Sequence, residues 1–473
     1  YKMNTVIKGF GWNFITQAYK VLFSSLILLI LARLIAVEDF GIIGMATVFV
    51  LFFNTIQNIG FDSSIIYSKT FKENHLLSLL ILNVIIGFFI YLVGFFLSPF
   101  LSSFYDNKEI ELIFKVLILT VLLSSIGIVS KGYLQKKLDF KKLAIVEIIA
   151  ITIAGILAIV LATGNYGYWS LVFQQLVTVG LTSLGLLLIT FKSIFKESFF
   201  SFKIISEHLK FGYNVFIFNV LNFFAQQLDV LVIGKLLGEK QVGIYLLAFN
   251  LILKPVSLLV QIFNKTIYPI LTKVKLSLIR ESYIKFTYSF FFFLAPLIIF
   301  SVSISQILIP ELLTNKWIDT LPLLLIFGYQ SVRMIIASPS GLLFLITGNP
   351  NKQWKYAIFI SIPLRFIGVF LGYYLFKSAL GIALGINLLA TIEALAGFYI
   401  TFKLINLKVF GYLKYFKSYF LSLFFLIIGL TIINNFISSV WFSCVVQVLI
   451  ITVFIVINKN EIIINIKKIK DII

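Results

Sequence analysis

Polar side chains recur at helical spacing inside four segments that are otherwise apolar. Within each segment they follow one another at steps of three or four, with Gln57 beside one set, so each set lies on one face of a helix. These residues are Asn13, Gln17, Lys20 and Ser24; Asn54, Gln57, Asn58 and Asp62; Asn219, Asn222, Gln226 and Asp229; and Asn250, Lys254, Ser257, Gln261 and Asn264. Their amides and hydroxyls donate and accept hydrogen bonds, and their ammonium and carboxylate groups carry charge.

Charged groups inside a membrane helix are costly, at about 2.5–3.5 kcal/mol or more when they face lipid. The four polar faces therefore predict one water-filled cavity, in which Lys20, Lys254, Asp62 and Asp229 avoid lipid. Two other interpretations stay open. The amides are suited to hydrogen bonds between packed helices, and Asp229 is suited to a purely structural charge pair with a lysine.

Other charged residues also lie within or near predicted helices. Arg333, one turn after Gln330, is a further candidate for the cavity lining. Glu147 and Lys115 lie near the ends of predicted helices, so we expect their side chains to extend to the membrane interface.

The elements that must position these residues are membrane-spanning helices. The chain has 473 residues, of which 60% are hydrophobic and only 12% charged, against about 25% charged in soluble domains. Apolar stretches near 20 residues recur along it and predict an all-α polytopic membrane protein with about 14 transmembrane helices. They lie near residues 11–34, 42–65, 76–98, 111–133, 143–163, 166–191, 211–236, 242–264, 286–309, 319–346, 355–376, 380–402, 415–436 and 440–457.

The net charge of +20 is unevenly distributed along the chain. Most lysines and arginines lie at the two ends and in every second connection, whereas the intervening connections hold few. The positive-inside rule then places both termini in the cytoplasm. The charge is explained by this topology and by attraction to anionic lipids, so it does not indicate a nucleic-acid partner.

Two segments indicate an internal repeat. ARLIAVEDFGIIG (32–44) aligns with GKLLGEKQVGIYL (234–246), and a shift of 202 residues places Arg33 on Lys235 and Gly41 on Gly243. Six predicted helices separate the copies, so both halves have the same orientation and form a parallel repeat. The predicted parts are a six-helix lobe at 1–200, a second six-helix lobe at 201–403, and two additional helices with a basic tail at 404–473.

Residues typical of several catalytic and metal sites are scarce. His75 and His208, the only histidines, lie beside basic connections, and Cys444 is the single cysteine. The sequence has no G-x-x-x-x-G-K-[ST] phosphate loop and no Cys/His cluster. We therefore predict no catalytic residue, no metal site and no bound cofactor.

Several short motifs together resemble a known family. The chain is similar, over most of residues 8–400, to bacterial lipid-linked oligosaccharide flippases of the Wzx type, in a superfamily that includes lipid II flippases and multidrug and toxin extruders. The motifs are RLIAVEDFGIIG (33–44), GFDSSII (60–66), KGYLQKKLDFKKLA (131–144), GYWSLV (167–172), QQLDVLVIGKLLGEKQVGIY (226–245), NKTIYP (264–269) and GLLFLITGNPN (341–351). Ala36 and Val37 depart from the small-Gly-Pro pattern that the family usually has in its first loop.

The resemblance implies two six-helix lobes in a V and a cavity lined by the first two helices of each lobe. It implies a substrate of oligosaccharide on polyprenyl pyrophosphate, moved from the inner to the outer leaflet of the bacterial cytoplasmic membrane by alternating access. The product would enter lipopolysaccharide, capsule or another surface polysaccharide. Membrane lipids and a polysaccharide polymerase are the implied partners.

Each polar group then has an expected role. Lys20, Lys254 and Arg333 would bind the pyrophosphate, because fixed cations hold anions strongly where the dielectric is low. The amides and serines would bond sugar hydroxyls. Asp62 and Asp229 would bind a coupling proton or sodium ion, or pair with the cations.

Two other functions remain as alternatives. An ion-coupled multidrug extruder of the same fold would carry mainly carboxylates within the membrane, whereas lysine and arginine are at least as frequent there in this chain. A membrane glycan polymerase or ligase would need a large extramembrane loop for its catalytic residues, and the predicted connections are short.

Overall fold

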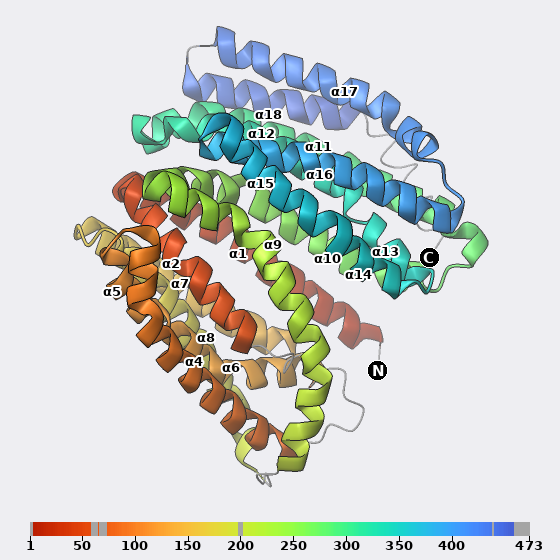
Figure 1. Cartoon of the computed structure of the whole chain (residues 1–473). Helices are drawn as coiled ribbons and strands as arrows, with labels where there is room; N and C mark the ends of the chain where they lie inside the picture. The colour runs from red at the N-terminus through yellow and green to blue at the C-terminus, as the bar shows by residue number, and fades with distance from the viewer. Residues whose placement is uncertain (1–2, 58–64, 66–72, 197–201, 438, 458–473) are drawn as a thin grey trace. The chain divides into compact units, whose positions relative to one another are not determined.

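Every regular element in the described part of the chain is helical. The computed structural model describes residues 3–57, 65, 73–196, 202–437 and 439–457 (Figure 1). The chain divides into two compact units, Tyr1–Gly243 and Ile244–Ile473. In Figure 1 the helices of the first unit run from red to yellow-green, and those of the second unit from green to blue.

The first unit contains seven complete α-helices and most of an eighth among its described residues. They are α1 (Met3–Leu34), α2 (Val37–Gln57), α4 (Leu76–Tyr105), α5 (Glu109–Leu117), α6 (Leu119–Lys136), α7 (Phe140–Thr163), α8 (Trp169–Phe195) and α9 (Phe202–Ala248). Helix α7 packs against both α1 and α8, α6 packs against α4 and α8, and α2 packs against α5. A hydrogen bond of 2.6 Å between the hydroxyls of Tyr19 and Thr152 ties α1 to α7.

The second unit begins at the end of α9 and includes two short π-helical segments. Its α-helices are α10 (Lys254–Leu271), α11 (Leu276–Leu313), α12 (Leu321–Ala337), α13 (Ser340–Ile346), α14 (Pro350–Tyr356), α15 (Ile362–Phe376), α16 (Ala379–Phe402), α17 (Val409–Phe436) and α18 (Val440–Ile457). The π-helical segments are η2 (Phe249–Leu253) and η4 (Ala357–Ser361). Helices α17 and α18 pack on α11, where Tyr419 donates a 2.6 Å hydrogen bond to the carbonyl of Phe292.

The predicted membrane helices are present, and the chain is a multi-pass membrane protein. Thirteen stretches in the described residues are long and apolar enough to cross a membrane. One of them, Asn222–Leu271, has 50 residues, which in a straight helix would be about 75 Å long against a hydrocarbon core of about 30 Å. Gly238 interrupts it with φ 82° and ψ 177°, a backbone conformation open to glycine. This stretch therefore corresponds to the two helices predicted at 211–236 and 242–264.

A close backbone contact joins the start of α2 to α9 within the first unit. A Cβ atom at Gly41 would lie 1.8 Å from the carbonyl oxygen of Glu239, and one at Gly243 would lie 2.2 Å from that of Val37. The 202-residue shift relates the two glycines to each other and the two carbonyls to each other. The contact thus has the reciprocal form expected of a repeat, which itself stays a prediction.

This contact also bears on where the compact units divide. The predicted lobes meet at 200/201, whereas the compact units meet at 243/244. Because α9 packs on α2 through Gly41 and Gly243, its residues up to that point belong to the first unit.

Candidate functional site

The polar face of α1 is centred on a charged cluster. Lys20 Nζ lies 2.5 Å from Glu147 Oε2 on α7, and Lys131 Nζ on α6 lies 3.4 Å from Glu147 Oε1. Glu147 is only 8% exposed. We expected its side chain to extend to the membrane interface; its carboxylate is buried between two ammonium groups from other helices, and its depth in the membrane stays a prediction.

We did not connect Lys20 with Glu147, or Glu147 with Lys131, because the three residues lie far apart in the sequence. A carboxylate two turns inside a membrane helix was the available signal, since such a group needs a cation or water. Elsewhere on this face Gln17 is half-buried and Ser24 is exposed. The side chain of Asn13 lies outside the described residues.

The polar face of α2 makes hydrogen bonds to α6. Gln57 is fully buried, and its Nε2 donates to the carbonyl of Val121 at 2.9 Å. Ser124 donates to Gln57 Oε1 at 2.9 Å and contacts Asn54 Oδ1 at 3.4 Å. This geometry is that of interhelical hydrogen bonding, the alternative left open for the amides. Asn58 and Asp62 lie outside the described residues.

The described part of the polar face of α9 changes from exposed to buried along the helix. Asn222 and Gln226 are exposed, whereas Asp229 is 5% exposed. Asp229 Oδ1 accepts a 3.0 Å hydrogen bond from the backbone N–H of Val230. The side chain of Asn219 is outside the described residues.

The fourth polar face begins in a π-helical turn. Asn250 lies in η2, and Lys254 at the start of α10 donates to Asn250 Oδ1 at 3.0 Å. Lys254 and Gln261 are exposed and Ser257 is half-buried. Asn264 Nδ2 donates to Ser338 Oγ at 3.0 Å, so it joins α10 to the end of α12. Single π-helical turns are frequent at functional sites.

Arg333 belongs to a polar network in the second unit. Its Nη1 donates to the carbonyl of Ala390 on α16 at 2.8 Å, and it is half-buried. One turn earlier, Gln330 accepts a 3.2 Å hydrogen bond from Asn387. Three residues beyond Ala390, the carboxylate of Glu393 accepts a hydrogen bond from Ser361 in η4. The network thus links α12 and η4 to α16.

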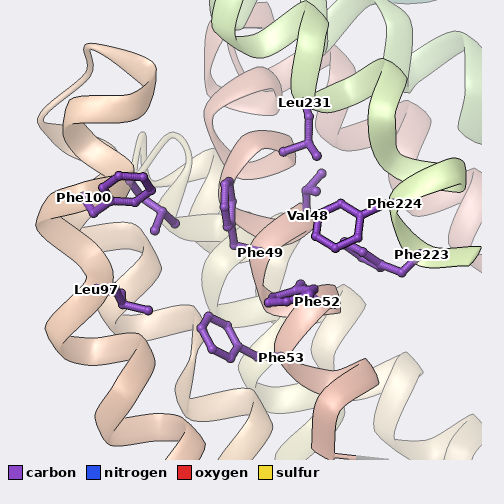
Figure 2. Close-up of a pocket in the computed structure, with 10 residues that line it drawn as sticks. Val48, Phe49, Phe52, Phe53, Leu97, Phe100, Phe223, Phe224 and Leu231 are labelled. Atoms are coloured by element: carbon purple, nitrogen blue, oxygen red, sulfur yellow. The ribbon is translucent and has the colours of Figure 1, made fainter. Parts of the chain in front are cut away.

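Helices α2 and α9 also line an apolar pocket of about 180 Å³ (Figure 2). Its lining residues are Val48, Phe49, Phe52, Phe53, Leu97, Phe100, Leu101, Phe223, Phe224 and Leu231. The ring centroid of Phe52 lies 5.4 Å from those of both Phe223 and Phe224. We did not predict this pocket, although paired phenylalanines within both helices were a signal for it. An apolar chain fits its chemistry.

Comparison with known proteins gives a consistent family. A model described as "polysaccharide biosynthesis protein" matches residues 30–322, more than half of the chain. The chain is 25% identical to the teichuronic acid biosynthesis protein TuaB of Bacillus subtilis, over 64% of this chain and 63% of that protein. It is 23% identical to the lipopolysaccharide biosynthesis protein WzxC of Escherichia coli, over 84% of this chain and 81% of that protein.

A solved structure shares the fold. The lipid II flippase MurJ in an inward closed conformation matches with a TM-score of 0.69 at 16% identity, over 95% of this chain and 100% of that one. At this identity the likeness shows the fold, and the resemblance expected from the sequence motifs is confirmed. On the family match, the chain belongs to the polysaccharide biosynthesis protein family.

Proposed function

We propose that this protein moves polyprenyl-pyrophosphate-linked oligosaccharide from the inner to the outer leaflet of the cytoplasmic membrane by alternating access, for surface polysaccharide synthesis. The observation that carries the proposal is a cationic cluster, Lys20 and Lys131 around buried Glu147, inside a bundle of membrane helices. Such charges are expensive in a membrane and mark sites for polar or anionic substrates. The names of TuaB and WzxC, which refer to cell-surface polymers, support this substrate class.

The described residues suit an amphipathic substrate. Lysine and arginine bind pyrophosphate through charge-assisted hydrogen bonds, which is the role we give to Lys20, Lys254 and Arg333. The exposed amides Asn222 and Gln226 match sugar hydroxyls. Moving a lipid between leaflets makes and breaks no covalent bond, so the proposed activity is transport and not catalysis.

The proposal also includes the orientation of the chain in the membrane and the energy source of transport. Both termini lie in the cytoplasm, so the lysine-rich helix ends face the side where the substrate is assembled. A proton or sodium gradient drives the cycle through Asp62 or Asp229, and no other cofactor takes part. On the outer side the substrate passes to a polysaccharide polymerase.

The test is a strain from which the gene is deleted. We expect polyprenyl-pyrophosphate-linked oligosaccharide to accumulate and surface polysaccharide to disappear, measured by lipid extraction and polymer quantification. Re-expression of the wild-type chain should reverse both changes, whereas a chain with Lys20, Lys254 and Arg333 all changed to alanine should not. Unchanged lipid and polymer together with a raised sensitivity to cationic dyes would replace the proposal with a multidrug extruder.

A further inference from the structure

We propose that Lys20, Lys131 and Glu147 form the loading site for the pyrophosphate group, with Glu147 as the residue that positions both lysines. The inference rests on the proposed function and adds two residues to it. Each carboxylate oxygen of Glu147 contacts a different ammonium group, at 2.5 Å for Lys20 and 3.4 Å for Lys131. One side chain therefore holds two cations from different helices next to each other.

The exposure of the three side chains favours an anion as the ligand. The side chain of Lys131 is 47% exposed and that of Lys20 is 26% exposed, whereas that of Glu147 is 11% exposed. An incoming ligand thus meets the ammonium groups and not the carboxylate. Two cations and one anion leave a net charge of one positive, so the cluster attracts an anion even while its internal ion pairs are intact.

The depth of the cluster places it near one membrane face. Glu147 lies seven residues after the start of α7 and Lys131 five residues before the end of α6. Lys20 lies 17 residues after the start of α1. At 1.5 Å per residue, Lys131 and Glu147 are about 7–10 Å inside the helix ends, and Lys20 lies at the same level because it pairs with Glu147. By the predicted topology these ends are cytoplasmic, where the substrate enters.

Two neighbouring ammonium groups distinguish a ligand with two phosphates from a ligand with one. A lysine acts as a point charge that contacts one phosphate at a time. A pyrophosphate presents two adjacent phosphates and so engages Lys20 and Lys131 together, whereas a monophosphate presents one phosphate and fully engages only one of the two lysines. The cluster therefore selects polyprenyl pyrophosphates over polyprenyl monophosphates.

Glu147 sets both the geometry and the strength of binding. It compensates two lysines whose charges would otherwise repel each other inside the bundle. Its negative charge also weakens the attraction for a bound anion, which a transporter needs because the substrate must leave after it has entered. Replacing Glu147 with glutamine keeps the shape of the side chain and removes this opposing charge.

The first test measures whether the protein prefers a diphosphate lipid to a monophosphate lipid and whether Lys131 is responsible. The full-length protein is purified into lipid nanodiscs, and dissociation constants are measured for farnesyl diphosphate and farnesyl monophosphate. We expect the wild type to prefer the diphosphate. Lys131→Ala should weaken diphosphate binding by about tenfold, equivalent to about 1.4 kcal/mol, and abolish most of the preference. Lys131→Arg should restore much of both.

The matched control is Lys142→Ala. Lys142 pairs with Asp139 three residues away on the same segment, with a side-chain exposure of 54%, and lies outside the cluster. Its replacement should leave both dissociation constants unchanged. If Lys131→Ala behaves like Lys142→Ala while the wild type still prefers the diphosphate, the loading-site inference is wrong and the proposed function stands. If the wild type binds neither lipid, the pyrophosphate substrate of the proposed function is wrong as well.

The opposing negative charge of Glu147 has its own signature. Glu147→Gln should bind farnesyl diphosphate about tenfold more tightly, because an opposing charge is gone, yet support less surface polysaccharide when it replaces the wild type in cells. A carboxylate that only stabilises the fold would give weaker or unchanged binding on removal, and that result would overturn the role. Where Glu147→Gln does not fold, the two Lys131 variants decide the inference.

Discussion

The charged cluster of the first unit and the arginine network of the second unit hold a membrane-embedded cation in different ways. Lys20 contacts a carboxylate, Glu147, which also contacts a second lysine. Arg333 instead donates to the backbone carbonyl of Ala390 at 2.8 Å. The carboxylate of Glu147 directly contacts the lysines and offsets their charge, whereas the hydrogen-bond partner of Arg333 is a carbonyl, and the carboxylate of Glu393 adds only an electrostatic attraction. Removing a partner should therefore affect the two regions differently.

The largest expected effect is on stability in the first unit. Glu147→Ala leaves two partly buried lysines beside each other, and we expect a loss of about 2–3 kcal/mol, somewhat below the range for fully buried pairs because both lysines reach solvent. Thermal unfolding of the purified protein measures it. The control Glu111→Ala breaks the i,i+4 pair with Lys115 and should cost about 0.5 kcal/mol. Equal losses in the two variants would show that the cluster is no more than a surface ion pair.

A smaller stability effect is expected at Arg333. Arg333→Ala frees the carbonyl of Ala390 and removes an electrostatic attraction to Glu393, and we expect a cost of about 1 kcal/mol. Transport should fall by about tenfold, as expected for losing one charge-assisted contact to the substrate. Arg333→Lys keeps the charge and should retain part of the activity. If Arg333→Ala destabilises the protein as much as Glu147→Ala does, the difference inferred between the two regions is wrong.

The salt dependence of ligand binding should show whether Lys131, the most exposed member of the cluster, contacts the ligand. The screening length falls from about 10 Å at 0.1 M salt to about 3 Å at 1 M. Lys131 is the most exposed of the three side chains, so wild-type binding of farnesyl diphosphate should weaken by severalfold over this range. Lys131→Ala should show a shallower dependence. Parallel salt curves for the two proteins would contradict a contact between Lys131 and the ligand.

The smallest effects are expected at neutral hydrogen bonds, one in each region. Tyr19→Phe removes the 2.6 Å bond to Thr152, and Gln330→Ala removes the 3.2 Å bond to Asn387. Both should cost about 0.5–1 kcal/mol in unfolding experiments. Asn387 keeps a bond to the carbonyl of Ala383 and Thr152 keeps one to that of Ile148, so Gln330→Ala should be the milder of the two because the bond it removes is longer. The reverse order would mean that Gln330 has a further role in its network.

The sequence predicts the helices well and their contacts poorly. The ends predicted at 34, 163 and 402 coincide with those of α1, α7 and α16, because apolar length and turn residues are local signals. The π-helical segments Phe249–Leu253 and Ala357–Ser361 have no such signal and were not predicted. The polar faces could be predicted from residue spacings of three and four, since that periodicity is a property of a single helix.

Partners across helices were beyond this approach. Lys20 was identified as a site residue from its own helix, but Glu147 follows more than one hundred residues later, and periodicity does not say which helices pack. The same limit explains Gln57, whose spacing suits a cavity and whose actual neighbours are Val121 and Ser124 on α6.

The turn at Gly238 has a consequence for how the chain is inserted during synthesis. It leaves only a few residues between two membrane helices that form one apolar stretch of 50 residues. Each helix carries charge, at Asp229 on one side and Lys254 on the other, and a charged helix alone in lipid is unfavourable. The two helices should therefore leave the insertion machinery together, and a substitution that disfavours the positive φ of Gly238 should cause misassembly before any step of transport.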